Sequence, residues 1–377
     1  MQNVAQAWLI YRLTESSFML GLAAFCGLFP VLILGLWGGV VADHVNRHRL
    51  LIIAHTAGLL QALILGIITV LGWVEAWHIL VFSTLLGVIH AFEIPARHTF
   101  LSDMVDRDHL PNAIALNSSA FNIARFSGPF IAGLLIAQWG EGIVFLINAA
   151  SFLAVLFGLQ QMRISIDSLA VINTSVFEKI KQGLAFAWSN KQIRLSLILL
   201  SVFSVVGTSL TVLMPVFTDL VFKGNSAVLG ILLGSMGLGA LVGAFTLAYL
   251  SSYHNLYKKI GLSGFVAGIC LVLFPTITNI SAVLPILALF GFCQTILAAS
   301  TNTMIQSLVD DHLRGRVMAI FSTVFIGFMP IGSILSGALA EIVGIKNTVY
   351  GFGVISIIVA SVYLLAGKSR VSLNGNE

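Results

Sequence analysis

Two ionisable side chains stand in otherwise apolar runs of the sequence, and they indicate the chemistry that this chain could perform. Arg125 lies near the middle of such a run, where a charge is costly unless it faces a cavity or a partner. It could bind an anion or hold an acidic proton carrier. It could also be a structural arginine bonded to helix carbonyls or to Asn122, and we favour a structural or gating role. Glu93 could carry a proton if desolvated or pair with Arg97 at i+4, and we favour the salt bridge.

Other kinds of chemistry find little support in the sequence. His44 and His48 have i,i+4 spacing, but no third ligand accompanies them, so we expect no metal site. A phosphate-binding loop with lysine and Ser/Thr is absent, which excludes ATP as the driving force, and no nucleophile–base pair suggests an enzyme. We expect no cofactor and no nucleic-acid partner. The cysteines lie inside apolar runs and are interpreted as small packing residues: Cys26, Cys270 and Cys293.

The segments that must position these side chains are long and apolar. Charged residues make up 9% of the chain, against about 25% in a typical soluble domain, and hydrophobic residues make up 58%. A helix of about twenty apolar residues crosses a hydrocarbon core. Eleven stretches qualify and none alternates as a β-barrel strand would, so we predict an all-α polytopic membrane protein. They are residues 18–42, 50–73, 77–94, 113–139, 143–159, 195–217, 227–250, 260–278, 281–303, 317–340 and 348–366.

The distribution of basic residues predicts the orientation. If the loop at residues 43–49 is cytoplasmic, nearly all of the 19 lysines and arginines fall on the cytoplasmic side. The exceptions are Arg12, Lys223, Lys346 and the mid-span Arg125. Arg12 is then outside, although residues 1–11 are too short to cross a membrane. We therefore expect a first helix whose beginning is missing. We also expect a multi-pass protein of the bacterial inner (plasma) membrane, with its C-terminus on the cytoplasmic side.

An internal repeat divides the chain. Asp108-His109-Leu110 and the similar segment at residues 311–313 each follow a long apolar span and open another that bears Gly, Ser and Pro. Repeated bundles with a substrate site between them are typical of secondary transporters. We predict an N-terminal bundle at 1–162 with an incomplete first helix, a cytoplasmic linker at 163–190, a C-terminal bundle at 191–367 and a cytoplasmic tail at 368–377.

The linker contains a pattern of its own. Phe177, Ile180, Leu184 and Trp188 fall on one helical face, which predicts an amphipathic helix on the cytoplasmic membrane surface. A plain linker is the alternative reading.

The loop after the second stretch carries a family resemblance. It contains Gly39, then Asp43 four residues on, then Arg47 and Arg49, which resembles the signature loop of the major facilitator superfamily. The glycine would let two helices approach closely. The family pattern usually has arginine and glycine at positions 44 and 46, where this chain has His and Asn.

Further segments resemble a bacterial exporter branch of this superfamily, the transmembrane secretion effectors, which include enterobactin exporters and macrolide efflux proteins. They are residues 2–14, the Glu93-x-Pro95-x-Arg97 element that closes the fourth helix, and residues 110–129 with Gly128-Pro129, expected to kink the fifth. The resemblance implies a twelve-helix fold of two six-helix bundles around a central cavity. It also places Asp43 beside Arg97 as a state-locking ion pair.

We therefore expect a secondary transporter that exports a small amphipathic molecule, a drug or a siderophore, by alternating access and against proton entry. Its expected partners are the substrate, membrane lipid and protons, and we expect a monomer. An uptake carrier for a small nutrient, a non-transporting membrane subunit and an inactive truncated transporter are the alternatives.

Overall fold

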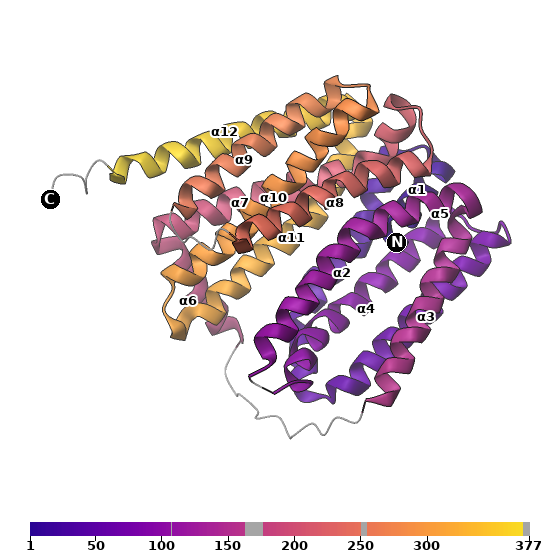
Figure 1. Ribbon diagram of the computed structural model, residues 1–377, viewed down its shortest axis with the longest axis horizontal. Coiled ribbons are helices and arrows are strands. Elements are labelled where there is room, and N and C mark those ends of the chain that lie inside the picture. Colours follow the sequence, from indigo (N-terminus) through magenta and orange to yellow (C-terminus); the bar gives the residue numbers. More distant parts are fainter. Residues whose placement is uncertain (107, 163–175, 250–254, 372–377) are drawn as a thin grey trace.

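A computed structural model describes residues 1–106, 108–162, 176–249 and 255–371. In these ranges almost every residue is helical (Figure 1). The N-terminal half contains α1 (Gln2–Thr14), α2 (Ser17–His44), α3 (Arg47–Val70), α4 (Ala76–Asp103) and α5 (Leu110–Gln161). After α6 (Val176–Ser189), the C-terminal half contains α7 (Lys191–Val216), η1 (Phe217–Val221), α8 (Ser226–Tyr249), α9 (Leu256–Leu273), η2 (Phe274–Thr276), α10 (Ile280–Leu308), α11 (Asp311–Val343) and α12 (Ile345–Val371).

The predicted membrane spans are confirmed as helices. Ten helices of the described ranges are long and apolar enough to cross a membrane. One of them, α5, has 52 residues and contains two predicted spans. A straight helix of that length would measure about 78 Å, more than twice a hydrocarbon core. The chain reverses at Gly140, whose φ of 79° suits glycine, so α5 forms two limbs. The first helix, α1, has 13 residues, about 20 Å.

The two halves lie side by side and meet along two pairs of helices, α2 with α11 and α5 with α8 (Figure 1). Glycines set both contacts. A Cβ on Gly133 of α5 would lie 2.6 Å from the Cα of Gly230 in α8. A Cβ on Gly337 of α11 would lie 3.0 Å from the Cα of Gly21 in α2. The two glycines fall at the ends of the repeated segments, so the internal repeat corresponds to two similar backbone contacts between halves.

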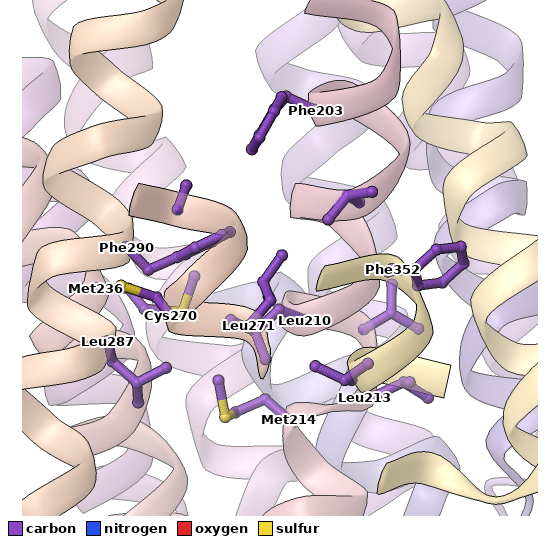
Figure 2. Packing of buried hydrophobic residues seen from close by; sticks show 14 of the residues in the cluster. Phe203, Leu210, Leu213, Met214, Met236, Cys270, Leu271, Leu287, Phe290 and Phe352 are labelled. Carbon is purple, nitrogen blue, oxygen red and sulfur yellow. The ribbon is translucent and has the colours of Figure 1, made fainter. Parts of the chain in front are cut away.

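The core of the C-terminal half is tightly packed. Figure 2 shows Phe203 and Met214 of α7 facing Phe290 of α10 and Cys270 of α9, all nearly or fully buried. Cys270 and Cys293 are buried free thiols and Cys26 is partly buried, which agrees with their interpretation as packing residues. Side chains of both halves join one continuous apolar cluster.

Helix ends differ from the prediction in two places. The prediction that the Glu93-x-Pro95-x-Arg97 element closes the fourth helix is wrong, because α4 continues to Asp103 with Pro95 inside it. The last helix continues to Val371, so the predicted tail at 368–377 begins as helix. In the linker, α6 occupies part of the predicted amphipathic segment, and residues 163–175 lie outside the described ranges. Leu184 and Trp188 are exposed, while the buried Ala187 lies on the side that packs against the bundle.

Candidate functional site

A cavity of about 310 Å³ lies between the two halves. It is lined by α1, α2 and α4 of the N-terminal half and by α7 and α11 of the C-terminal half. Its polar lining residues are Asn3, Gln6, Ser83, His90, Thr208 and Thr211. Apolar side chains such as Leu20, Leu28 and Val212 make up most of the remaining wall. A concave, mostly apolar site with a few convergent polar groups suits a small amphipathic ligand.

Behind the cavity, a chain of buried amides ties the N-terminal helices together. Asn148 donates to Gln2 Oε1 at 2.6 Å, Gln2 donates to Gln61 Oε1 at 2.8 Å, and Gln61 donates to the carbonyl of Phe82 at 3.1 Å. These bonds connect α5, α1, α3 and α4 in that order. Each buried amide thereby has the partner that a polar group needs in an apolar interior.

Hydrogen bonds join the halves at the end where α2 begins and α11 ends, called here the Tyr11 gate. Tyr11 of α1 donates its hydroxyl to Asp219 Oδ2 of η1 at 2.9 Å. Ser16 Oγ and the backbone N–H of Phe18 both donate to Glu341 Oε2 at 3.3 Å. All three bonds cross from the N-terminal to the C-terminal half, so they must break if the halves separate at this end.

The same end is braced within the N-terminal half. Arg12 makes a two-point contact with Glu141, from Nε to Oε1 and from Nη2 to Oε2, both at 3.0 Å. The Glu141 side chain is only 7% exposed. This fork holds the end of α1 against the turn between the limbs of α5, which places Tyr11 for its contact with the other half.

The signature loop lies at the opposite end of α2, and its side-chain contacts with the end of α4 are made by Arg47. Arg47 Nη1 lies 2.9 and 2.7 Å from the two carboxylate oxygens of Asp103 at the end of α4, and Nε donates to the carbonyl of Ala42. Arg49 is exposed. The side chain of Asp43 lies outside the described residues, so the predicted Asp43–Arg97 pair stays a prediction.

The glycine of close approach in this segment is Gly38 and not the predicted Gly39. A Cβ on Gly39 would meet no atom within 4 Å, whereas one on Gly38 would lie 2.9 Å from the carbonyl carbon of Ala91 in α4 and closer still to its oxygen. Pro95 has no N–H to bond that oxygen, which is left free four residues earlier. The bare backbone at Gly38 packs over it, and this explains how α4 tolerates Pro95 in mid-helix.

The second predicted proline follows the same rule. Pro129 of α5 leaves the carbonyl of Arg125 without its helical partner, and a Cβ on Gly237 of α8 would lie 3.0 Å from that oxygen. The helix stays continuous through Gly128 and Pro129, and the kink expected there stays a prediction.

Glu93 is buried, 8% exposed, and Arg97 Nε lies 3.0 Å from its Oε1. The favoured salt bridge is therefore confirmed. Glu93 also lies one turn from His90, which lines the cavity, and its role as a proton carrier stays a prediction.

Arg125 departs from the expectation of a buried structural residue. Its side chain is exposed on the isolated chain, and no hydrogen bond or ion pair joins it to another described residue. Asn122, its proposed partner, donates instead to the carbonyl of Ser118 in its own helix. The physical reason is that Ile114 and Phe121, on the same side of α5, are also exposed, so no described segment covers this face.

Reasoning from the sequence missed Gln6, His90, Asp103 and the Tyr11 gate. Asp103 carried a usable signal, because it is an acid at the end of a span that the charge distribution places on the same side of the membrane as Arg47 and Arg49. The gate carried none, because Tyr11 and Asp219 are 208 residues apart.

Comparisons with known proteins agree with this arrangement. A family model described as transmembrane secretion effector matches residues 1–372. The chain is 29% identical to a staphyloferrin A transporter of Staphylococcus aureus, over 97% of this chain and 92% of that protein. It is 26% identical to the multidrug efflux pump Tap of Mycolicibacterium fortuitum, over 92% and 86% of the two chains.

A macrolide efflux protein A of Streptococcus pyogenes is 23% identical, over 97% of this chain and 92% of its own. The fold resembles the crystal structure of the nucleoside transporter NupG, with a TM-score of 0.74, 13% identity and coverage of 97% and 94%. The chain is thus a multi-pass membrane protein and belongs to the transmembrane secretion effector family of the major facilitator superfamily.

Proposed function

We propose that this protein is a secondary active exporter that carries a small amphipathic molecule, a drug or a siderophore, through its central cavity by alternating access. The observation that carries the proposal is a cavity whose wall comes from both halves of the chain. Rocking of the halves would expose such a cavity to either side in turn. Two of the relatives are named for efflux, of multiple drugs and of macrolides, which supports export as the direction, and the name of a third, a staphyloferrin A transporter, supports a siderophore as cargo.

We further propose that the present conformation faces inward. The charge bias puts the signature loop in the cytoplasm, so the Tyr11 gate is on the outer side and is closed. Arg125 supports this view. It lies about 15 residues, roughly 22 Å, from each end of its limb of α5. An exposed guanidinium at that depth is costly in lipid and acceptable in a water-filled cleft.

Proton entry is the proposed driving force, with Glu93 as the carrier. In the inward-facing state Glu93 is held by Arg97 at 3.0 Å, and a change of state that separates the pair would favour protonation of the buried carboxylate. The division into bundles at 1–162 and 191–367, with a cytoplasmic tail, is part of the same proposal.

The test uses everted membrane vesicles from a bacterium that expresses the chain, energised by respiration, with a radiolabelled macrolide and with staphyloferrin A as probes. Export then appears as uptake into the vesicle. We expect accumulation above that of vesicles without the protein, and its loss when a protonophore collapses the gradient. Accumulation only in right-side-out vesicles would make the protein an uptake carrier. No accumulation in either preparation would indicate a non-transporting membrane subunit.

Glu93→Gln tests the coupling, with Glu75→Gln as the matched control because Glu75 is exposed just before the same helix. We expect Glu93→Gln to lose gradient-driven accumulation while still exchanging labelled probe across the membrane. A Glu93→Gln protein that accumulates probe as fully as Glu75→Gln would refute Glu93 as the carrier.

A further inference from the structure

One side chain of the cavity wall can change its charge near neutral pH. Among the described residues that line the cavity, this is true of His90 alone. Its ring is partly buried, makes no hydrogen bond to another described residue, and is not among the buried polar groups that lack a partner. The ring nitrogens are therefore accessible from the cavity, where a bound molecule can contact them.

The charges around His90 favour an anion. Two groups act on the ring electrostatically, Arg97 two turns further along α4 and His55 of α3. Glu93 lies one turn from His90 and is held by Arg97 at 3.0 Å, so its charge is already matched. The described lining of the cavity contains no Asp or Glu. A protonated His90 thus has no counter-charge in the cavity, and a bound carboxylate would supply one.

We infer that His90 binds a carboxylate group of the transported molecule, and that its ring takes up a proton as the carboxylate arrives. This rests on the proposed function, because it assigns the cavity to the transported molecule and names that molecule as an amphipathic anion. A charge without a partner is costly in a mostly apolar cavity. A carboxylate and an imidazolium together add no net charge and share a charge-assisted hydrogen bond.

Charge and protons balance over a transport cycle. The carboxylate and the His90 proton enter the cavity from the cytoplasm and leave together on the outer side. With one proton entering through Glu93 in exchange, the net movement is one negative charge outward. A membrane potential that is negative inside favours that movement. Glu93 stays the proposed path of proton entry, while His90 supplies the charge that holds the cargo.

The test compares two probes of similar shape, 2-naphthoate and 2-naphthamide, of which only the first is charged. Binding to the purified full-length protein in detergent is measured by calorimetry at pH 7.5, with empty micelles subtracted, in phosphate and in Tris buffer. These buffers differ in ionisation enthalpy, so the difference between the two measurements counts the protons taken up. We expect uptake close to one proton per bound naphthoate and none per bound naphthamide.

The dependence of affinity on pH gives the sign of the effect. A histidine ring without a counter-charge is mostly neutral above about pH 7.5. As the pH falls from 8.5 to 7.5, the affinity for naphthoate should therefore rise by up to about tenfold, while that for naphthamide should not change. At pH 6.5 naphthoate should bind about tenfold more tightly than naphthamide, because its hydrogen bond is charge-assisted.

Three variants separate His90 from its surroundings. His90→Gln should lose the proton uptake and the pH dependence but keep its affinity for naphthamide, which shows that the variant folds. His90→Arg has a fixed charge, so it should bind naphthoate without taking up a proton. His98→Gln is the matched control, because His98 is exposed on the same helix and is also acted on by Arg97. It should behave as the wild-type protein does.

Two results on the wild-type protein would overturn the inference without any variant: no proton uptake with naphthoate, or equal affinities for the two probes at pH 6.5. Unchanged proton uptake in His90→Gln would overturn it as well, because the proton would then bind elsewhere.

Binding needs no gradient and no movement across a membrane, so this result separates from the transport test. Vesicle export with no proton-linked binding of naphthoate would leave the proposed function standing without the His90 site. Proton-linked binding without export would leave the site standing and remove the function.

Discussion

Removal of the Tyr11 hydroxyl should open the Tyr11 gate without affecting the rest of the fold. In Tyr11→Phe the aromatic ring, which is 5% exposed, keeps its packing, and only the 2.9 Å hydrogen bond to Asp219 is lost. A hydrogen bond to a charged acceptor contributes about 1.5–3 kcal/mol, and the exposure of Asp219 puts this one near 1.5 kcal/mol. Since 1.4 kcal/mol is a factor of ten, the outward-open population should rise about tenfold.

The assay measures distances between spin labels on the two halves at this end. Trp73, in the turn before α4, and Thr278, in the turn before α10, are both exposed and lie outside the gate. They are replaced by cysteine in a background that lacks Cys26, Cys270 and Cys293. The wild-type sequence should show one dominant short distance, and Tyr11→Phe should add a longer one whose share grows about tenfold.

Two controls separate the hydrogen bond from other effects of the substitution. Tyr350→Phe changes an exposed tyrosine near the start of α12 that makes no hydrogen bond to other described residues, and it should shift nothing. Asp219→Ala should give the same shift as Tyr11→Phe, and the double variant should add little to either. Equal distance distributions in Tyr11→Phe and the wild-type sequence would refute the reasoning, because the bond would then not distinguish the states.

The length and number of the spans could be predicted because they are local properties. Each of the eleven predicted stretches coincides for most of its length with a helix of the structure, and Gly140 explains why two of them share α5. The repeat was also readable, since the segments after Leu110 and Leu313 lead to Gly133 and Gly337 at matching contacts. A pattern of this kind needs no knowledge of what lies opposite.

Partners across the fold could not be predicted, because residue type does not specify register between helices. Gln6 and Gln61 are both glutamines in apolar helices. Gln61 is bonded to Gln2 and to the carbonyl of Phe82, whereas Gln6 lines the cavity and its Nε2 has no partner among the described residues. Arg47 was named, but its acid is Asp103 in another helix. Sequence alone gives the cost of burying such groups and leaves open which of them are compensated.

Pro95 was misplaced for a different reason. The family resemblance placed the Glu93-x-Pro95-x-Arg97 element at the end of the fourth helix, and a proline inside a helix leaves a carbonyl without its hydrogen bond. Within a membrane protein the freed oxygen of Ala91 is covered by the backbone of Gly38, and the helix continues. The sequence contains both halves of this arrangement, proline on one helix and glycine on another, but only packing shows that they meet.

Three further substitutions test the contacts described above. Gly21→Ala should weaken the closed gate, because its Cβ would lie 3.0 Å from the Cα of Gly337. Gly35→Ala, in the same helix with open space around it, should stabilise by up to about 1 kcal/mol; equal melting temperatures would contradict this contrast. Arg47→Lys loses the two-point contact with Asp103 and should cost about 1 kcal/mol in thermal unfolding, with no further loss when Asp103→Asn is added. Arg125→Leu removes a guanidinium that has no partner among the described residues in the proposed inward-facing state. The melting temperature should therefore rise, while an uncharged probe is still exported. A lower melting temperature would show instead that Arg125 is a structural residue held by a contact.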